Sequence, residues 1–188
     1  KIREFFVADS KHTFVIADYS QIELRVLAPV SDDKNMINML KNRDADIHSE
    51  TAAKIFNTNI DSVTKDMRRK AKEVNFGLIY GMESFGLSKS LDISKKEADE
   101  LIKAYFGQFP KIKGFLEKIV VDATKNTYTE TLYGRKRFIR ELSSSNFQVK
   151  AMGKRIAMNA PIQGTASDIM KIAMIKLIKK LSPLESTN

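Results

Sequence analysis

Four side chains that suit a nucleotide recur at steps of four residues in the stretch RRKAKEVNFGLIYG: Arg68, Lys72, Phe76 and Tyr80. Residues four apart lie on the same face of an α-helix, so this spacing would align all four along one stripe. The two cations suit the oxygens of a polyphosphate, and the two rings suit a flat base. The stretch therefore predicts a helix with one nucleotide-binding face.

An ordinary amphipathic helix is the competing interpretation, with the rings in the core and the cations in water. Such a helix would place its charges opposite its aromatic residues, whereas here both kinds share one stripe. Asn75, Gly77 and Gly81 also weaken a helix, which makes them poor choices for a purely structural element. The full pattern therefore favours binding.

An acidic residue stands where an apolar segment changes direction. Residues 14–28, FVIADYSQIELRVLA, are typical of a buried strand that ends at Asp18 and leads directly into a helix. A carboxylate there can bind Mg²⁺ while the ion keeps coordination sites for phosphate. A turn or cap aspartate is the simpler interpretation of a lone Asp18. Ser20 and Glu23 have the spacing of a capping box, which would also explain Glu23 structurally.

Short strands are indicated near the N-terminus, at residues 4–8 and 13–19. After them the chain is predicted to be helical almost throughout, except at residues 128–139.

Several helix ends are marked by particular residues. Ser94 with Glu97 makes a capping box, and Pro110 suits the first turn of a helix. Pro161 and Gly164 indicate a break between two helices, because proline lacks the amide donor that a helix interior needs.

The chain is basic: 32 Lys+Arg against 23 Asp+Glu give a net charge of +9 and a pI near 9.6. This balance agrees with a nucleic-acid partner. A group of cations follows a predicted turn at Tyr133 and Gly134: Arg135, Lys136, Arg137 and Arg140. A hairpin that binds a nucleic-acid backbone and a charged strand edge that prevents aggregation explain this group equally well.

Composition bounds the class of protein. With 188 residues, 43% of them hydrophobic, the chain can form one domain, or one subdomain with part of another. It has no cysteine, which excludes disulfides and thiolate metal sites within it and fits a reducing cytoplasm. The start lacks the apolar core of a signal peptide and no apolar run could span a bilayer, so we expect a soluble protein with no membrane partner.

Three motifs, in order along the chain, resemble DNA polymerases of family A. ADYSQIELR resembles that family's first catalytic motif, RRKAKEVNFGLIYG its fingers helix, and RIAMNAPIQGTASD its primer-template motif. Three ordered motifs argue against a chance match. The resemblance implies a predominantly α-helical α+β fold with few short β-strands, and a DNA-directed DNA polymerase, a nucleotidyltransferase of DNA replication and repair.

The resemblance also implies how the metal and triphosphate are bound. Asp18 and the backbone carbonyl of Tyr19 would hold part of a two-Mg²⁺ site, which activates the primer hydroxyl and stabilises the leaving pyrophosphate. Arg68, Lys72 and His48 would contact the triphosphate, with Lys72 also a general acid toward the pyrophosphate. Without the resemblance, His48 would be interpreted as a surface histidine.

For the sugar and base, the resemblance implies four further residues. Phe76 would pack against the incoming nucleotide, and Tyr80 would guard the insertion site. Glu23 would be a steric gate against the ribose 2′-hydroxyl, which selects deoxynucleotides. Gln21 would also bind the nucleotide. Core packing is the alternative for both rings.

The resemblance makes primer-template DNA a partner beside the deoxynucleoside triphosphates. Arg155, Asn159 and Gln163 advance in steps of four and would contact phosphates and the minor groove of primer and template. Minor-groove acceptors look alike at every correct pair, so such contacts test pairing without reading sequence.

The resemblance divides the chain into a partial palm at residues 1–23, a fingers subdomain at 24–149 and a further part of the palm at 150–188. The family's second catalytic carboxylate belongs to a His-Asp-Glu motif further downstream, and the chain ends before it. We therefore expect a fragment with an incomplete Mg²⁺ site that polymerises poorly or not at all alone. Its parent would act in the bacterial cytoplasm, at the nucleoid.

Two other functions remain as alternatives. A non-catalytic nucleic-acid-binding module derived from a polymerase would keep the basic surface, but intact Asp18, Lys72 and Phe76 argue against it. A single-subunit RNA polymerase would share the architecture, but Glu23 argues against a pocket that accepts ribose.

Overall fold

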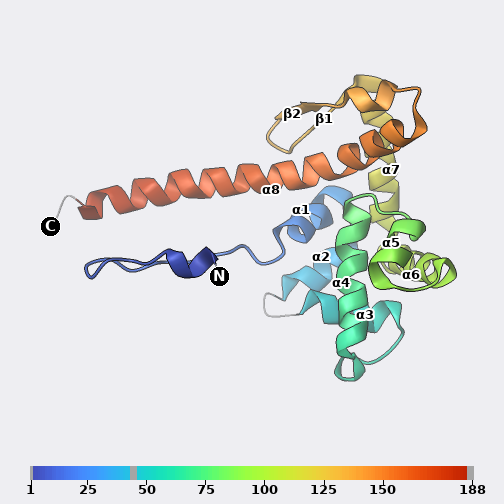
Figure 1. The fold of residues 1–188 in the computed structure, drawn as a ribbon, viewed down its shortest axis with the longest axis horizontal. Coiled ribbons are helices and arrows are strands. Elements are labelled where there is room, and N and C mark those ends of the chain that lie inside the picture. Colours follow the sequence, from blue (N-terminus) through green and yellow to red (C-terminus); the bar gives the residue numbers. More distant parts are fainter. Residues whose placement is uncertain (1, 43–45, 186–188) are drawn as a thin grey trace.

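A computed structural model describes residues 2–42 and 46–185, which are mostly helical (Figure 1). The predicted fold class is confirmed. The α-helices are α1 (Ile22–Ser31), α2 (Lys34–Lys41), α3 (Ile47–Ile55), α4 (Lys65–Ile79), α5 (Ser84–Leu91), α6 (Lys95–Gln108), α7 (Pro110–Asn126) and α8 (Phe147–Glu185). Short 3₁₀ helices are η1 (Ile2–Phe5), η2 (Ile60–Ser62) and η3 (Arg140–Ser143).

Local signals fixed several helix starts as predicted. The Ser94 hydroxyl accepts from the Glu97 amide at 3.2 Å, and the Glu97 carboxylate accepts from the Ser94 amide at 2.9 Å, which completes the capping box of α6. Pro110 opens α7. The nucleotide-binding helix predicted from Arg68 onward is α4, whose first turn is capped by the Thr64 hydroxyl.

The helices α1 to α8 all contribute to one main core. Its largest fully buried side chains are Leu24, Leu27, Met36, Ile47, Val74, Ile79, Leu87, Tyr105, Phe109, Ile112 and Ile162. Burial of each such side chain contributes about 1.5–3 kcal/mol. The helix α4 packs against α3, α5 and α6, so one face of α4 is fixed by the core.

The non-helical region predicted at residues 128–139 is a hairpin. Strands β1 (Tyr128–Glu130) and β2 (Lys136–Phe138) pair antiparallel, with Tyr128 opposite Phe138. The turn between them contains Gly134 at φ 77°, a conformation that glycine adopts without strain.

The two N-terminal strands were predicted wrongly. Residues 2–5 form η1, and residues 13–19 have no regular secondary structure. Phe14, Val15 and Ile16 have the composition of a strand, but they are 57%, 87% and 90% exposed. A strand needs a hydrogen-bonded neighbour, and the sheet of the described residues contains only β1 and β2.

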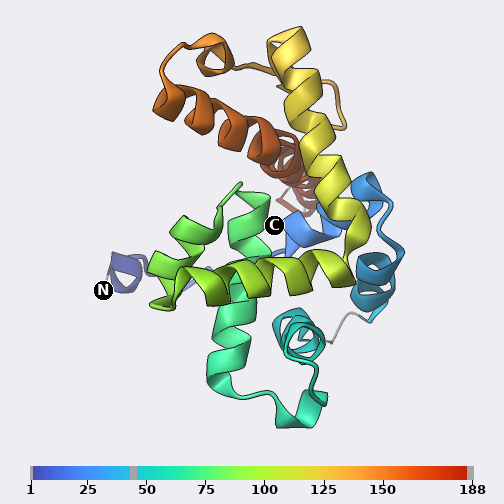
Figure 2. The same cartoon turned by 90° about the vertical axis from the view of Figure 1, so that its right-hand side faces the viewer.

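The predicted break at Pro161 and Gly164 is also wrong, because both residues lie inside α8. Figures 1 and 2 together show that α8 changes direction along its length, and a proline in a helix interior commonly causes such a bend. Buried Ile162 and Thr165 hold the helix on both sides of Gly164, and the Thr165 hydroxyl accepts from the Leu132 amide at 3.0 Å. Packing therefore outweighs the local signal.

No helix among residues 2–42 and 46–185 combines the length and apolarity needed to cross a bilayer.

Candidate functional site

The predicted stripe on α4 faces the start of α3. Arg68 pairs with Asp46, which precedes α3, and the Phe76 ring lies 5.6 Å from the His48 ring between centroids. The buried side of α4 is formed by other residues, including Ala71, Val74 and Leu78. The cations therefore do not lie opposite the aromatic residues, as a simple amphipathic helix would require. Tyr80 follows directly after α4 as its C-cap.

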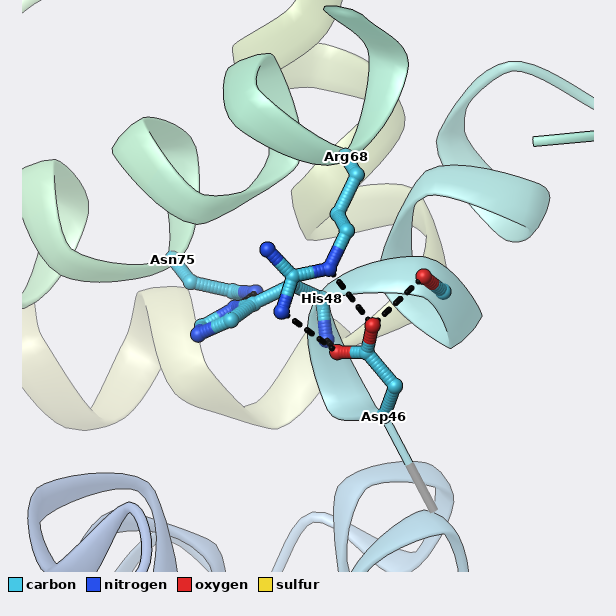
Figure 3. Close-up of polar contacts among 5 residues, drawn as sticks. Asp46, His48, Arg68 and Asn75 are labelled. Atoms are coloured by element: carbon cyan, nitrogen blue, oxygen red, sulfur yellow. Dashed lines mark hydrogen bonds and ion pairs between the residues drawn. The ribbon is translucent and has the colours of Figure 1, made fainter. Parts of the chain in front are cut away.

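His48 is buried, with 6% of its surface exposed, so the surface-histidine interpretation is wrong. The Asn75 side-chain amide nitrogen lies 3.2 Å from His48 Nδ1 (Figure 3). It also donates to the Thr51 hydroxyl at 3.2 Å. An amide nitrogen donates, so this contact fits a neutral ring that accepts at Nδ1 and carries its proton on Nε2. Burial lowers the pKa of His48, and the charges of Arg68 and Lys72 lower it further against the opposing effect of Asp46.

Asp46 binds the Arg68 guanidinium through both carboxylate oxygens (Figure 3). Hydrogen bonds from Arg68 and Ser49 lower the pKa of Asp46 to about 2, although burial acts in the opposite direction. Asp46 was not among the site residues predicted from the sequence. An aspartate directly before a helix signals an N-cap, but nothing in the sequence links it to Arg68.

Glu23 does not form the expected capping box with Ser20. The N-cap of α1 is Gln21, whose backbone is left-handed at φ 54°, and no side chain caps the helix. This geometry leaves Ser20 outside the cap position, where its carbonyl accepts from Arg25 Nε at 3.1 Å. The capping interpretation of Glu23 is therefore wrong.

The Glu23 carboxylate instead joins α1 to the end of α4. The Tyr80 hydroxyl lies 3.1 Å and 3.0 Å from the two Glu23 oxygens and donates to that carboxylate. Burial raises the pKa of Tyr80, and the charge and hydrogen bond of Glu23 raise it further. Glu23 and Gln21 are half-buried at the start of α1, so the structure brings Gln21, Glu23 and Tyr80 into one region.

The three residues predicted to bind DNA lie on α8. Arg155 and Gln163 are exposed and Asn159 is partly buried, and the unbroken helix keeps them at steps of four. Gly81, at φ 69°, lies so close to α8 that an added Cβ would be 3.0 Å from Arg155 Cγ. The turn after Tyr80 is therefore packed directly against Arg155.

The basic hairpin has mixed roles. Arg135 Nε donates to Asp168 at 2.8 Å and its Nη2 donates to the Gly164 carbonyl at 3.0 Å, which fixes the hairpin on α8. Lys136 lies over the Tyr128 ring, 4.3 Å from its centroid. Arg137 and Arg140 are exposed. Neither of our two interpretations predicted the structural role of Arg135.

Asp18 and Tyr19 are exposed and precede α1. A carboxylate and a backbone carbonyl are suitable ligands for Mg²⁺. Within the part of the chain that the structure describes, however, no group of three or more histidine, aspartate or glutamate side chains is placed to hold a metal ion. These residues alone do not fit a complete metal site.

The environment of His48 predicts a dependence of stability on pH. Because the pKa of folded His48 lies below its ordinary value of 6.5, the unfolded chain binds more protons as pH falls through 6.5. The free energy of unfolding should therefore decrease below about pH 6.5. Chemical denaturation at several pH values measures this, and an NMR titration locates the His48 pKa.

His48→Gln is the matched variant for this measurement. It should flatten the decrease between neutral pH and about pH 3.8, the ordinary pKa of Asp46, below which the ion pair of Asp46 also begins to lose its contribution to stability. A His48 titration midpoint at or above 6.5 would contradict the buried, neutral ring.

Comparison with known proteins supports one family. A family model described as DNA polymerase family A matches residues 1–187. The DNA polymerase I of Caldicellulosiruptor bescii is 49% identical over 180 residues, which cover 96% of this chain and 21% of that protein. The DNA polymerase I of Bacillus caldotenax is 48% identical over 182 residues, with the same 96% and 21% coverage. This chain thus spans about a fifth of the length of these curated relatives.

A solved structure is similar in both fold and sequence. It is described as the POL domain of Pol1 from M. smegmatis in complex with DNA primer-template and dNTP. The TM-score is 0.84 and the sequence identity is 42%, over 89% of this chain and 30% of that one.

Proposed function

This chain belongs to DNA polymerase family A, and from that membership we propose that it carries the nucleotide-binding face of a DNA-templated DNA polymerase. The observation that carries the proposal is the convergence of Arg68, Lys72 and Phe76 on His48. In the reaction, the primer 3′-hydroxyl attacks the α-phosphorus of a deoxynucleoside triphosphate. A phosphorus–oxygen bond to the β-phosphate breaks, and pyrophosphate leaves.

Binding of the triphosphate is assigned to the start of α4. Arg68 and Lys72 are exposed cations in the first half of this helix, where the helix dipole adds positive potential. His48 is neutral and holds its Nε2 proton for donation to a phosphate oxygen. Lys72 neutralises charge on the leaving pyrophosphate and gives it a proton. Phe76, half-buried beside His48, packs against the sugar and base.

Selection of the sugar is assigned to Glu23. The Tyr80 hydroxyl shares its single proton between the two oxygens of this carboxylate, and this hydrogen bond orients the carboxylate toward a ribose 2′-hydroxyl. Gln21 stands at the start of the same helix and binds the nucleotide from there.

Primer and template DNA are assigned to Arg155, Asn159 and Gln163 on α8. The contact of Gly81 with Arg155 joins this surface to the end of the nucleotide-binding helix. Residues 24–149 form the fingers in this proposal, and residues 1–23 and 150–188 belong to the palm. Asp18 and the Tyr19 carbonyl would hold Mg²⁺ together with ligands from outside the described residues. The chemistry that such a metal site would supply is activation of the primer hydroxyl and stabilisation of the leaving oxygen.

The protein acts in DNA replication or repair in the bacterial cytoplasm, at the nucleoid. A non-catalytic nucleic-acid-binding module is the second candidate, favoured by the net charge of +9 and the exposed cations of the hairpin.

Primer extension by the full-length protein tests the proposal. We expect Mg²⁺-dependent, template-directed use of deoxynucleotides. Binding of DNA without extension would favour the module, and equal use of ribonucleotides would favour an RNA polymerase.

Replacement of Glu23 should relax the choice of sugar. Glu23→Ala should raise ribonucleotide incorporation relative to deoxynucleotide incorporation by about 10-fold to 100-fold, because it removes both the bulk and the carboxylate of the side chain. Glu23→Gln keeps the bulk and should retain most of the discrimination. Tyr80→Phe keeps the ring, removes the hydroxyl that donates to the Glu23 carboxylate and should give an intermediate result. Competition between the two nucleotide classes in one extension reaction measures the ratio.

A further inference from the structure

The guanidinium of Arg68 is already bound to an anion within the chain. Arg68 Nε donates to Asp46 Oδ2 at 2.5 Å, and Nη2 donates to Oδ1 at 3.3 Å. These residues lie 22 apart in the sequence, one before α3 and the other near the start of α4. The pair thus depends on the packing of α3 against α4.

The Asp46 carboxylate is also fixed by its own helix. It accepts from the His48 amide at 3.2 Å and from the Ser49 hydroxyl at 2.7 Å, as the N-cap of α3. Arg68 has no comparable second anchor in the described residues, and its side chain is 46% exposed. A ligand that binds the Arg68 guanidinium would therefore move the long arginine side chain and leave Asp46 in place.

A phosphate and this carboxylate need the same part of Arg68. Both anions present two oxygens that match the planar guanidinium fork. A phosphate placed on another edge of the guanidinium would still lie close to the negative charge of Asp46, which is unfavourable. Binding of a polyphosphate at Arg68 is therefore coupled to loss of the Asp46 contact.

We propose that Asp46 is a positioning residue that holds Arg68 in place and competes with the polyphosphate for it. The inference rests on the proposed function, because it takes Arg68 to be a ligand of the triphosphate. Asp46 keeps the cation extended toward the site before the nucleotide arrives. Asp46 also lowers the net affinity for the nucleotide, because the nucleotide must first displace the Asp46–Arg68 ion pair. A ligand that makes fewer phosphate contacts displaces this ion pair less readily.

Calorimetric titration of the purified protein with inorganic tripolyphosphate tests this inference. Asp46→Asn keeps an N-cap acceptor and removes the charge, so the helix should remain intact. We expect tripolyphosphate to bind Asp46→Asn about fivefold more tightly than the unchanged protein. Asp66→Asn is the matched control, because it also removes one negative charge from a helix start. Asp66 pairs with Arg69 at 2.7 Å and with Lys70 at 3.1 Å, and not with Arg68. This substitution should change the affinity by less than about twofold.

The Arg68→Ala background separates competition from simple repulsion. There, Asp46→Asn should no longer tighten binding, and an unchanged fivefold gain would overturn the inference. The Arg68 Nε–H resonance gives a second measurement, since it should shift when tripolyphosphate is added to the unchanged protein. An unshifted resonance despite binding, or no gain in Asp46→Asn, would overturn the inference alone. Absence of any binding by the unchanged protein would overturn the proposed nucleotide site itself.

Discussion

Lys72→Ala should lower the rate of nucleotide incorporation by the full-length protein about 10²-fold to 10³-fold. Lys72 is exposed and lies between Arg68 and Phe76 on the face of α4 that is directed toward His48. The charge of Lys72 contributes to the lowered pKa of His48. Negative charge grows on the phosphate oxygens as the leaving bond breaks, so a cation there stabilises the transition state more than the bound substrate. Single-turnover incorporation should show a fall in the maximal rate larger than any rise in KM.

Two further variants define what Lys72 does. Lys70→Ala removes a lysine from the same helix that pairs with Asp66 at 3.1 Å, and it should leave the rate nearly unchanged. Lys72→Arg keeps the charge but holds its proton too tightly for general-acid catalysis. A large loss in Lys72→Arg would support proton donation, and near-normal activity would assign Lys72 to charge neutralisation alone. A rise in KM with an unchanged rate in Lys72→Ala would contradict both roles.

The parts of this chain predicted well from sequence depend on neighbours in the sequence. The stripe of α4 follows from the period of the helix, and the α6 cap follows from the three-residue spacing of Ser94 and Glu97. The hairpin turn follows from the freedom of Gly134. The order of motifs also identified the family, which the match over residues 1–187 confirms.

The parts predicted wrongly depend on partners distant in the sequence. Residues 13–19 have the composition of a strand but no neighbouring strand among the described residues. Pro161 carries a local signal to end a helix, which the packing of α8 against α1 and α7 outweighs. In both cases the outcome depends on tertiary contacts, which a local sequence pattern does not contain.

The site shows the same limit in its polar contacts. Tyr80 and Glu23 are 57 residues apart, and Arg68 and Asp46 are 22 apart, so no helical or strand period relates the members of either pair. Sequence placed Glu23 in a capping box, and only the left-handed backbone of Gln21 shows why that box does not form. The candidate site residues were recognisable by type, but the pairing of Tyr80 with Glu23 and that of Arg68 with Asp46 were not.

Asp18→Asn should lower primer extension by the full-length protein about 10³-fold, because a metal ligand stabilises the transition state by several kcal/mol. Asp18 is exposed, and its carboxylate is not committed to a helix cap, since α1 has no side-chain cap. The substitution keeps the shape of the side chain and removes the charge that a divalent cation needs. Extension rates across a Mg²⁺ titration measure both the loss and the metal requirement.

Asp9→Asn is the matched control for Asp18, because Asp9 is an exposed aspartate of the same N-terminal segment that pairs with His12 at 2.7 Å. It should extend primers normally. Tripolyphosphate binding should be unchanged in Asp18→Asn, since the triphosphate is assigned to α4 and His48. Loss of extension with retained tripolyphosphate binding would separate the metal function of Asp18 from nucleotide binding. Normal extension by Asp18→Asn would show that this carboxylate is not a metal ligand, and the N-terminal segment would then have only a structural role.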